Sequence, residues 1–175
     1  MKTLKQLGIF AIIDLFILSC SSVQVKTDYD TQTDFTQYKT FAFYKKGIDK
    51  SKISDLDKRR ILRAIEKELL TKGMTKSNNP DMLVSIFAKS KQKVDVYTNP
   101  WYPSYYGMYW QNNVSRYTEG TLFIDLIDKN GKKLIWQGVG RGALSTSNKV
   151  EKKEERINEF VAEILNRFPP GNEKK

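Results

Sequence analysis

The first twenty residues constrain this 175-residue chain most, because they decide where a folded domain can begin. Lys2 and Lys5 form a short positive region, and residues 7–18 form an apolar run whose single charge is Asp14. A basic start followed by such a run is typical of a secretory signal, and the run is too short to cross a bilayer core about 30 Å thick. We therefore expect residues 1–19 to be removed.

The signal ends at Cys20, the single cysteine of the chain, which cannot form an intramolecular disulfide. Ile17-Leu18-Ser19-Cys20 resembles the lipobox of bacterial lipoproteins, in which the cysteine receives a diacylglyceryl group and becomes the new N-terminus. We expect residues 20–22 to be a lipidated cysteine and a short tether; an ordinary buried cysteine is the alternative. No aspartate follows Cys20, which favours the periplasmic face of the outer membrane, with the cell surface as the alternative.

The rest of the chain is strongly basic. Its formal net charge is +10, and removal of residues 1–19 leaves +9, with 28 basic against 19 acidic residues. Such a charge favours contact with anionic lipid, anionic glycan or envelope proteins, and a soluble lysine-rich surface is the alternative. No nucleic-acid motif is present, and an exported chain has little access to nucleic acid.

Five stretches carry the patterns of β-strands. Val23 to Tyr29 alternates with period two, which predicts a half-buried strand. Four more are rich in apolar, β-branched or aromatic residues. They are residues 38–44, 81–89 with an extension through 97, 120–128 and 133–144. Asn130-Gly131 suits a positive φ and predicts a hairpin between the last two.

Two stretches have helical periodicity. Ser54 with Asp57 predicts the start of the first helix, and Gly73 predicts its end. Asn148 with Glu151 predicts the start of the second helix, which ends at the pair Pro169-Pro170. Each has one apolar stripe. The stripes are Ile61, Leu62, Ile65 and Leu69, then Ile157, Phe160, Val161, Ile164, Leu165 and Phe168.

The predicted order is β-β-α-β-β-β-α, with neighbouring strands joined by turns. This order predicts an α+β two-layer sandwich, in which an antiparallel or mixed sheet carries two helices on one face. Residues 23–170 are expected to form a single domain, followed by a frayed tail at 171–175.

An aromatic segment at residues 98–113 interrupts the strand pattern. It contains no charge, and its prolines and glycine predict a long loop joining two strands. Tyr and Trp suit a bilayer interface, a sugar or a protein partner. We expect either a contact surface or a loop that folds back over the open sheet face. Its aromatic residues are Trp101, Tyr102, Tyr105, Tyr106, Tyr109 and Trp110.

Several stretches together resemble the envelope lipoprotein family catalogued as domain of unknown function 4136. The marks are the segment from Asp34-Phe35 to Thr40, the strand Gly120 to Asp128, LIWQG at Leu134 to Gly138, and Phe168-Pro169-Pro170. The resemblance runs from about Val23 to Pro170. It implies an exported, lipid-anchored α+β domain with no established activity, so no catalytic residue is carried over.

The residue inventory also limits catalysis. Histidine is absent, which excludes histidine acid–base chemistry, histidine triads and the commonest zinc sites. Asp125 and Asp128 fall on opposite faces of a strand and are not expected to act as a pair. We expect a non-catalytic binding or structural module without cofactor; the alternative is a carboxylate-dependent hydrolase acting on cell-wall glycans.

Two remaining motifs favour structural interpretations. GVGRG at residues 138–142 lies within a predicted strand rather than at a strand-to-helix turn, so we expect a bulge or close backbone approach instead of a phosphate site. Asp28, Asp30 and Asp34 lack the glycine and terminal glutamate of a calcium loop, and we expect them to form turns rather than a metal site.

Overall fold

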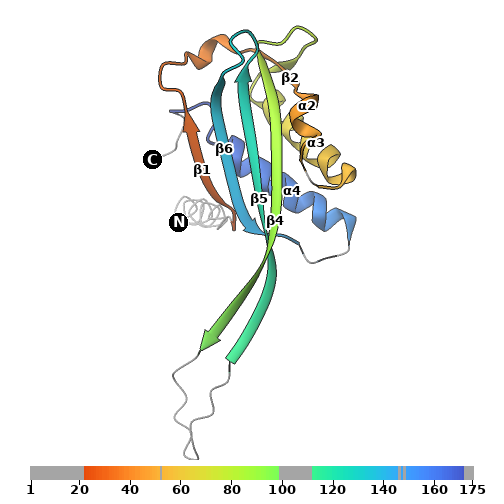
Figure 1. Cartoon of the computed structure of the whole chain (residues 1–175). Coiled ribbons are helices and arrows are strands. Elements are labelled where there is room, and N and C mark those ends of the chain that lie inside the picture. Colours follow the sequence, from red (N-terminus) through yellow and green to blue (C-terminus); the bar gives the residue numbers. More distant parts are fainter. Residues whose placement is uncertain (1–21, 52, 99–111, 146, 148, 172–175) are drawn as a thin grey trace, which may run out of the picture.

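The computed structural model describes residues 22–51, 53–98, 112–145, 147 and 149–171. It shows a six-stranded mixed sheet with helices α3 and α4 on one face, which confirms the predicted α+β class (Figure 1). The elements are β1 (Gln24–Tyr29), η2 (Phe35–Gln37), β2 (Thr40–Phe43), α2 (Lys45–Ile48), α3 (Asp55–Thr71), β3 (Thr75–Lys76), β4 (Met82–Thr98), β5 (Asn112–Asp128), β6 (Leu134–Ala143) and α4 (Val150–Leu165).

The strand order is β1-β6-β5-β4-β2-β3. Strands β1, β6, β5 and β4 are antiparallel neighbours, whereas β2 runs parallel to β3 and β4. The expectation that turns join all neighbouring strands is therefore wrong at β2, because α3 lies in the connection from β2 to β4. Asp81, just before β4, links this strand to the start of β2. Its Oδ2 accepts hydrogen bonds from the backbone N–H groups of Lys39 (3.0 Å) and Thr40 (2.9 Å).

Helix α3 forms as its sequence predicts. The Ser54 hydroxyl accepts a hydrogen bond from the Asp57 N–H (3.1 Å) and so satisfies one unpaired donor of the first turn. The helix ends before Gly73, whose φ of 79° favours glycine. Its buried stripe consists of Ile61, Ala64, Ile65 and Leu69.

Helix α4 begins with a different residue from the one expected. Lys149 occupies the N-cap position and makes no side-chain cap hydrogen bond, so the cap proposed at Asn148 is one residue off. Asn148 itself lies outside the described residues. The predicted apolar stripe is confirmed, since Phe160, Val161 and the later stripe residues are buried against the sheet, with Ile157 half-buried.

Strand β6 lies unusually close to α4 because its helix-facing positions are glycines. A Cβ atom added at Gly138 would lie 2.4 Å from Ile164 Cγ2, and one at Gly140 would lie 2.8 Å from Ile164 Cδ1. The buried Trp136 fills the space beyond them and contacts Phe168 edge-on (ring centroids 5.4 Å apart). The GVGRG motif is thus a close backbone approach, as expected.

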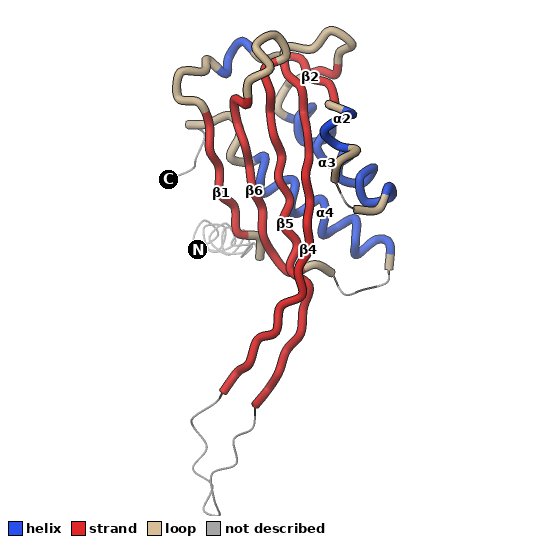
Figure 2. Tube along the Cα trace, in the orientation of Figure 1, coloured by secondary structure: helices blue, strands red, loops and turns tan. Residues whose placement is uncertain are grey.

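Strands β4 and β5 form a long hairpin that extends well beyond the sheet (Figure 2). Their register continues without a shift from Met82↔Asp128 to Thr98↔Asn112. The expected extension of the first strand through residue 97 is confirmed, but the second strand starts at Asn112 rather than Gly120. The predicted loop at 98–113 is therefore too long, and the connection is residues 99–111.

The turn between β5 and β6 has a different geometry from the expected one. The positive φ falls on Lys132 (51°) instead of on the Asn-Gly pair. The Asp128 carboxylate accepts a hydrogen bond from the Gly131 N–H within this turn.

Candidate functional site

The candidate site lies at one end of the sheet, which we call the base. Gln24 at the start of β1 pairs with Arg141 of β6, Arg141 pairs with Thr121 of β5, and Thr121 pairs with Lys89 of β4. The start of β1 and the point where the β4–β5 hairpin leaves the sheet are thus at the same level (Figure 1). The N-terminal start of the domain and the projecting hairpin therefore both lie at the base.

Arg156 of α4 holds the base together. Its Nη1 donates hydrogen bonds to Ser22 Oγ (2.7 Å) and Glu159 Oε2 (2.6 Å), and its Nε donates to the Ala143 carbonyl (2.8 Å). The guanidinium also stacks on Phe160, with Cζ 4.6 Å from the ring centroid. The side chain is only 13% exposed, so these charge-assisted bonds fix Ser22 against α4 and the end of β6.

A small cavity of about 100 Å³ opens beside Arg156. Its apolar lining comes from Ile61, Ala88, Leu122, Leu144, Ile157 and Phe160. Leu144 lies directly over Gly120, where an added Cβ would be 2.3 Å from Leu144 Cδ2. The cavity fits a small apolar group and offers no pair of acid and base side chains.

The hairpin beyond the base, residues 91–98 and 112–119, is called the ribbon. Pairing between β6 and the ribbon ends at the Glu119↔Ala143 pair. The next contact is a hydrogen bond from the Leu144 N–H to the Thr118 carbonyl (2.8 Å). From Ser90 to Thr98 the strand advances eight residues, or about 26 Å. The ends of the ribbon, Thr98 and Asn112, therefore lie far from the body.

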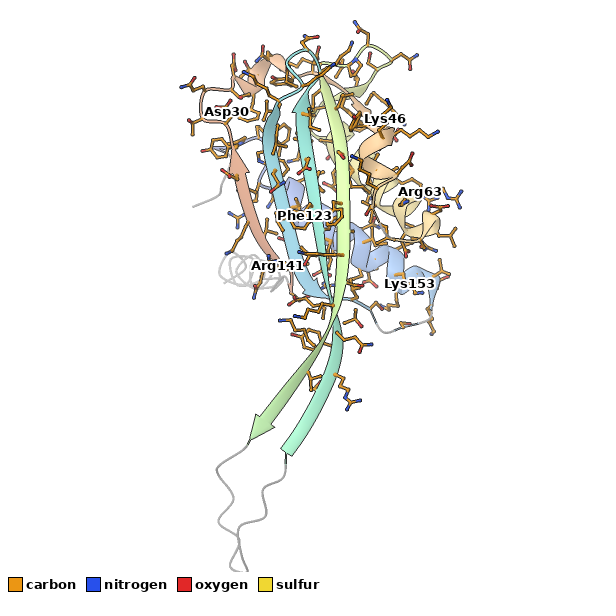
Figure 3. The ribbon with its side chains drawn as sticks, in the orientation of Figure 1. Asp30, Lys46, Arg63, Phe123, Arg141 and Lys153 are labelled. Atoms are coloured by element: carbon orange, nitrogen blue, oxygen red, sulfur yellow. The ribbon has the colours of Figure 1, made fainter. Side chains whose placement is uncertain are left out.

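The sheet face opposite α3 and α4 is open among the described residues. Its centre is the Phe87–Phe123 pair, with ring centroids 5.8 Å apart, and Lys89 Nζ lies 5.5 Å from the Phe123 centroid. Figure 3 shows Phe123 in the middle of this face. Beside the pair, burial raises the pKa of the Asp125 carboxyl, and a hydrogen bond from Gln137 Nε2 (2.7 Å) opposes the rise.

The alternative that the aromatic segment folds back over this open face stays a prediction, because residues 99–111 lie outside the described residues.

The predicted lipidation and aromatic site residues lie outside the described residues. These are Cys20, Trp101, Tyr102, Tyr105, Tyr106, Tyr109 and Trp110. The structure does place the segments next to them, because Ser22 is fixed at the base and the ribbon leads to residues 99–111. The Arg156 cluster had no signal in the sequence, since an arginine in an amphipathic helix is ordinary.

The aspartates considered as metal or catalytic candidates have separate local roles. Asp30 accepts from the Gln32 N–H (3.0 Å) and Asp34 from the Thr36 N–H (2.9 Å), which supports the interpretation as turns. Asp128 accepts from the Tyr38 hydroxyl (3.2 Å), away from the Asp125–Gln137 pair. Within the described part of the chain, no group of three acidic or cysteine ligands is placed to hold a metal ion.

Among the described helices, none is both long and apolar enough to cross a membrane.

The fold defines the class as a two-layer α+β domain on a mixed sheet. The family model described as Domain of unknown function (DUF4136) matches residues 25–170, and the chain belongs to that family. A search of the curated proteins gave no match.

Two solved structures have a similar fold. A PDZ domain protein from Parabacteroides distasonis is 18% identical with a TM-score of 0.54, and the match covers 93% of this chain but 40% of that one. The PelC dodecamer from Paraburkholderia phytofirmans is 11% identical with a TM-score of 0.50, over 82% of this chain and 94% of that chain. At these identities, the likeness concerns the fold.

Proposed function

We propose that this protein is a lipid-anchored, non-catalytic binding or structural module of the bacterial cell envelope. Acylated Cys20 would hold it in the outer membrane on the periplasmic face. The observation that carries the proposal is the fixation of Ser22 by Arg156. Cys20 is two residues away, within about 7 Å of Ser22, so a lipid on its sulfur would hold the base close to the membrane.

The proposed contact surface is the aromatic segment, Trp101 to Trp110. Tyrosine and tryptophan favour the membrane–water interface and protein interfaces. The ribbon extends from the same end of the sheet as the proposed tether, which supports a position of the segment on the membrane side. Candidate partners are anionic lipid, an envelope protein or an anionic glycan, and nucleic acid is not among them.

The anchor is tested with Cys20→Ala in the native host. We expect wild-type protein to fractionate with membranes and to carry the mass of a lipid modification. The Cys20→Ala protein should be released into the soluble fraction without the added mass. Equal masses, together with membrane association of the variant in high salt, would contradict the anchor.

One observation keeps the hydrolase as a second candidate. Asp125 and Asp28 lie in one row of the open face, because each pairs in register with Gln137. Their Cα atoms are thus two strand spacings apart, about 9.6 Å, and a raised carboxyl pKa is a property of glycosidase acids. Turnover of peptidoglycan fragments by the full chain, lost in Asp125→Asn, would establish this activity; we expect no turnover.

A further inference from the structure

The ribbon buries almost nothing against the described part of the chain. Beyond the base neither outer strand edge has a backbone partner among the described residues, and Val94 is 55% exposed. Two-stranded ribbons are only marginally stable by themselves in water, and free strand edges favour association. A ribbon of this length is therefore suited to a contact outside the body.

The two faces of the ribbon differ in charge. Paired residues of an antiparallel ladder lie on the same face, so the pairs Val94↔Arg116 and Val96↔Val114 belong to one face. The pairs Lys91↔Glu119, Lys93↔Tyr117 and Asp95↔Ser115 belong to the other. One face thus has three valine positions and a single charge, and the other has four charged positions. The face of Val94 also has the polar pairs Gln92↔Thr118 and Thr98↔Asn112, so it is the less charged face of the ribbon.

The position of the base limits how the ribbon is oriented. This step rests on the proposed anchor at Cys20, which keeps Ser22 at the base within about 7 Å of the acylated residue. The ribbon continues about 26 Å from the same end, nearly the thickness of a hydrocarbon core. A ribbon along the membrane normal would carry unpaired backbone groups into the hydrocarbon, where each costs several kcal/mol. A ribbon parallel to the surface avoids this cost.

We propose that the ribbon lies along the lipid surface, with the face of Val94 and Arg116 in the headgroup layer and the face of Lys93 and Ser115 in water. In this position Val94 contacts the boundary of the acyl chains. Arg116 pairs with lipid phosphate, which makes anionic lipid the preferred surface. The proposed contact involves only residues 91–98 and 112–119 and does not depend on the segment between them.

The test places a fluorescent label on either face of the ribbon in the full, lipidated chain. Val94→Cys and Ser115→Cys are matched variants, because both side chains are exposed and their positions lie on opposite faces. Acylation of Cys20 leaves only the introduced thiol for an NBD label. The protein is reconstituted at about one copy per vesicle in phosphatidylethanolamine and phosphatidylglycerol. Intact mass confirms the lipid on Cys20 independently.

We expect the label at position 94 to shift to the blue, to be quenched by spin-labelled lipid, and to lose iodide quenching several-fold. The label at position 115 should keep the emission and iodide quenching of a label in water. Equal iodide access at both positions would overturn the proposal. Protection of position 94 only at high protein density would replace the lipid surface by a second copy of the chain. Protection of both positions would indicate that the ribbon inserts into the bilayer, which would also overturn the proposal.

The outcome for the ribbon is separate from that for the anchor. If the mass shows no lipid on Cys20, the proposed function fails and so does the orientation derived from it. If the lipid is present and both labels remain in water, the anchor stands and the ribbon proposal fails.

Discussion

Strands β4 and β5 pass through two environments, and the contrast separates backbone pairing from side-chain burial. In the body, Val84, Ile86, Ile124 and Leu126 are almost fully buried under the helices. In the ribbon, the same ladder continues in register while Val94 is more than half exposed. Hydrogen-bond pairing alone thus extends the hairpin, and the stability of the domain must come from the body.

The largest expected effect tests this contrast directly. Ile124→Ala should lower the free energy of unfolding by about 2–5 kcal/mol, because it leaves a cavity in the core. Val94→Ala should change it by no more than about 0.5 kcal/mol, since that side chain is exposed. Urea denaturation of the two variants gives both values. Similar losses would show that the ribbon belongs to the cooperative core.

Glycine substitutions sharpen the comparison at the edge of the body. Gly140→Ala puts a Cβ 2.8 Å from Ile164 Cδ1, a fully buried side chain, and should cost about 1–3 kcal/mol. Gly120→Ala is the matched control, because the three atoms nearest its Cβ all belong to Leu144, which is 38% exposed and can move. Thermal unfolding should show a clearly lower midpoint for Gly140→Ala alone. Ile164→Val should partly restore it.

The smallest effect concerns pH and the open face. Burial raises the pKa of Asp125 in the folded state, so ionisation of this carboxyl opposes folding. Its favourable contribution is complete below the ordinary carboxyl pKa and is lost as the pH rises through the folded-state value. Asp125→Asn should therefore stabilise the domain at neutral pH and have no such benefit in acid. Unfolding curves across this range that show a constant difference would contradict the burial argument.

The sequence predicted the elements that have local signals. The Ser54 cap, the Gly73 terminus and both apolar stripes are properties of single helices, and the structure confirms them. The first eight residues of β5 were missed because Asn112 to Glu119 has no apolar run; its pairing with β4 sets its conformation. Parallel pairing of β2 with β4 also depends on tertiary contacts that no local pattern encodes.

The candidate site was predictable in part. Cys20 and the aromatic residues follow from sequence patterns, and they stay predictions. The base could not be predicted, since it brings Ser22, Ala143 and Arg156 together from three distant segments. The difference in charge between the two ribbon faces is present in the alternation of residues 91–98, but it can be assigned to faces only once the register with β5 is known.

The most direct test of the account is amide hydrogen exchange on the lipidated chain in anionic vesicles and on Cys20→Ala in solution. We expect amides of the body, residues 82–88 and 122–128, to exchange slowly and equally in both. Ribbon amides, residues 91–98 and 112–118, should exchange quickly in solution and several-fold more slowly on the vesicles. Equal exchange of the ribbon in both states would contradict the claim that it is a membrane-contact element outside the core.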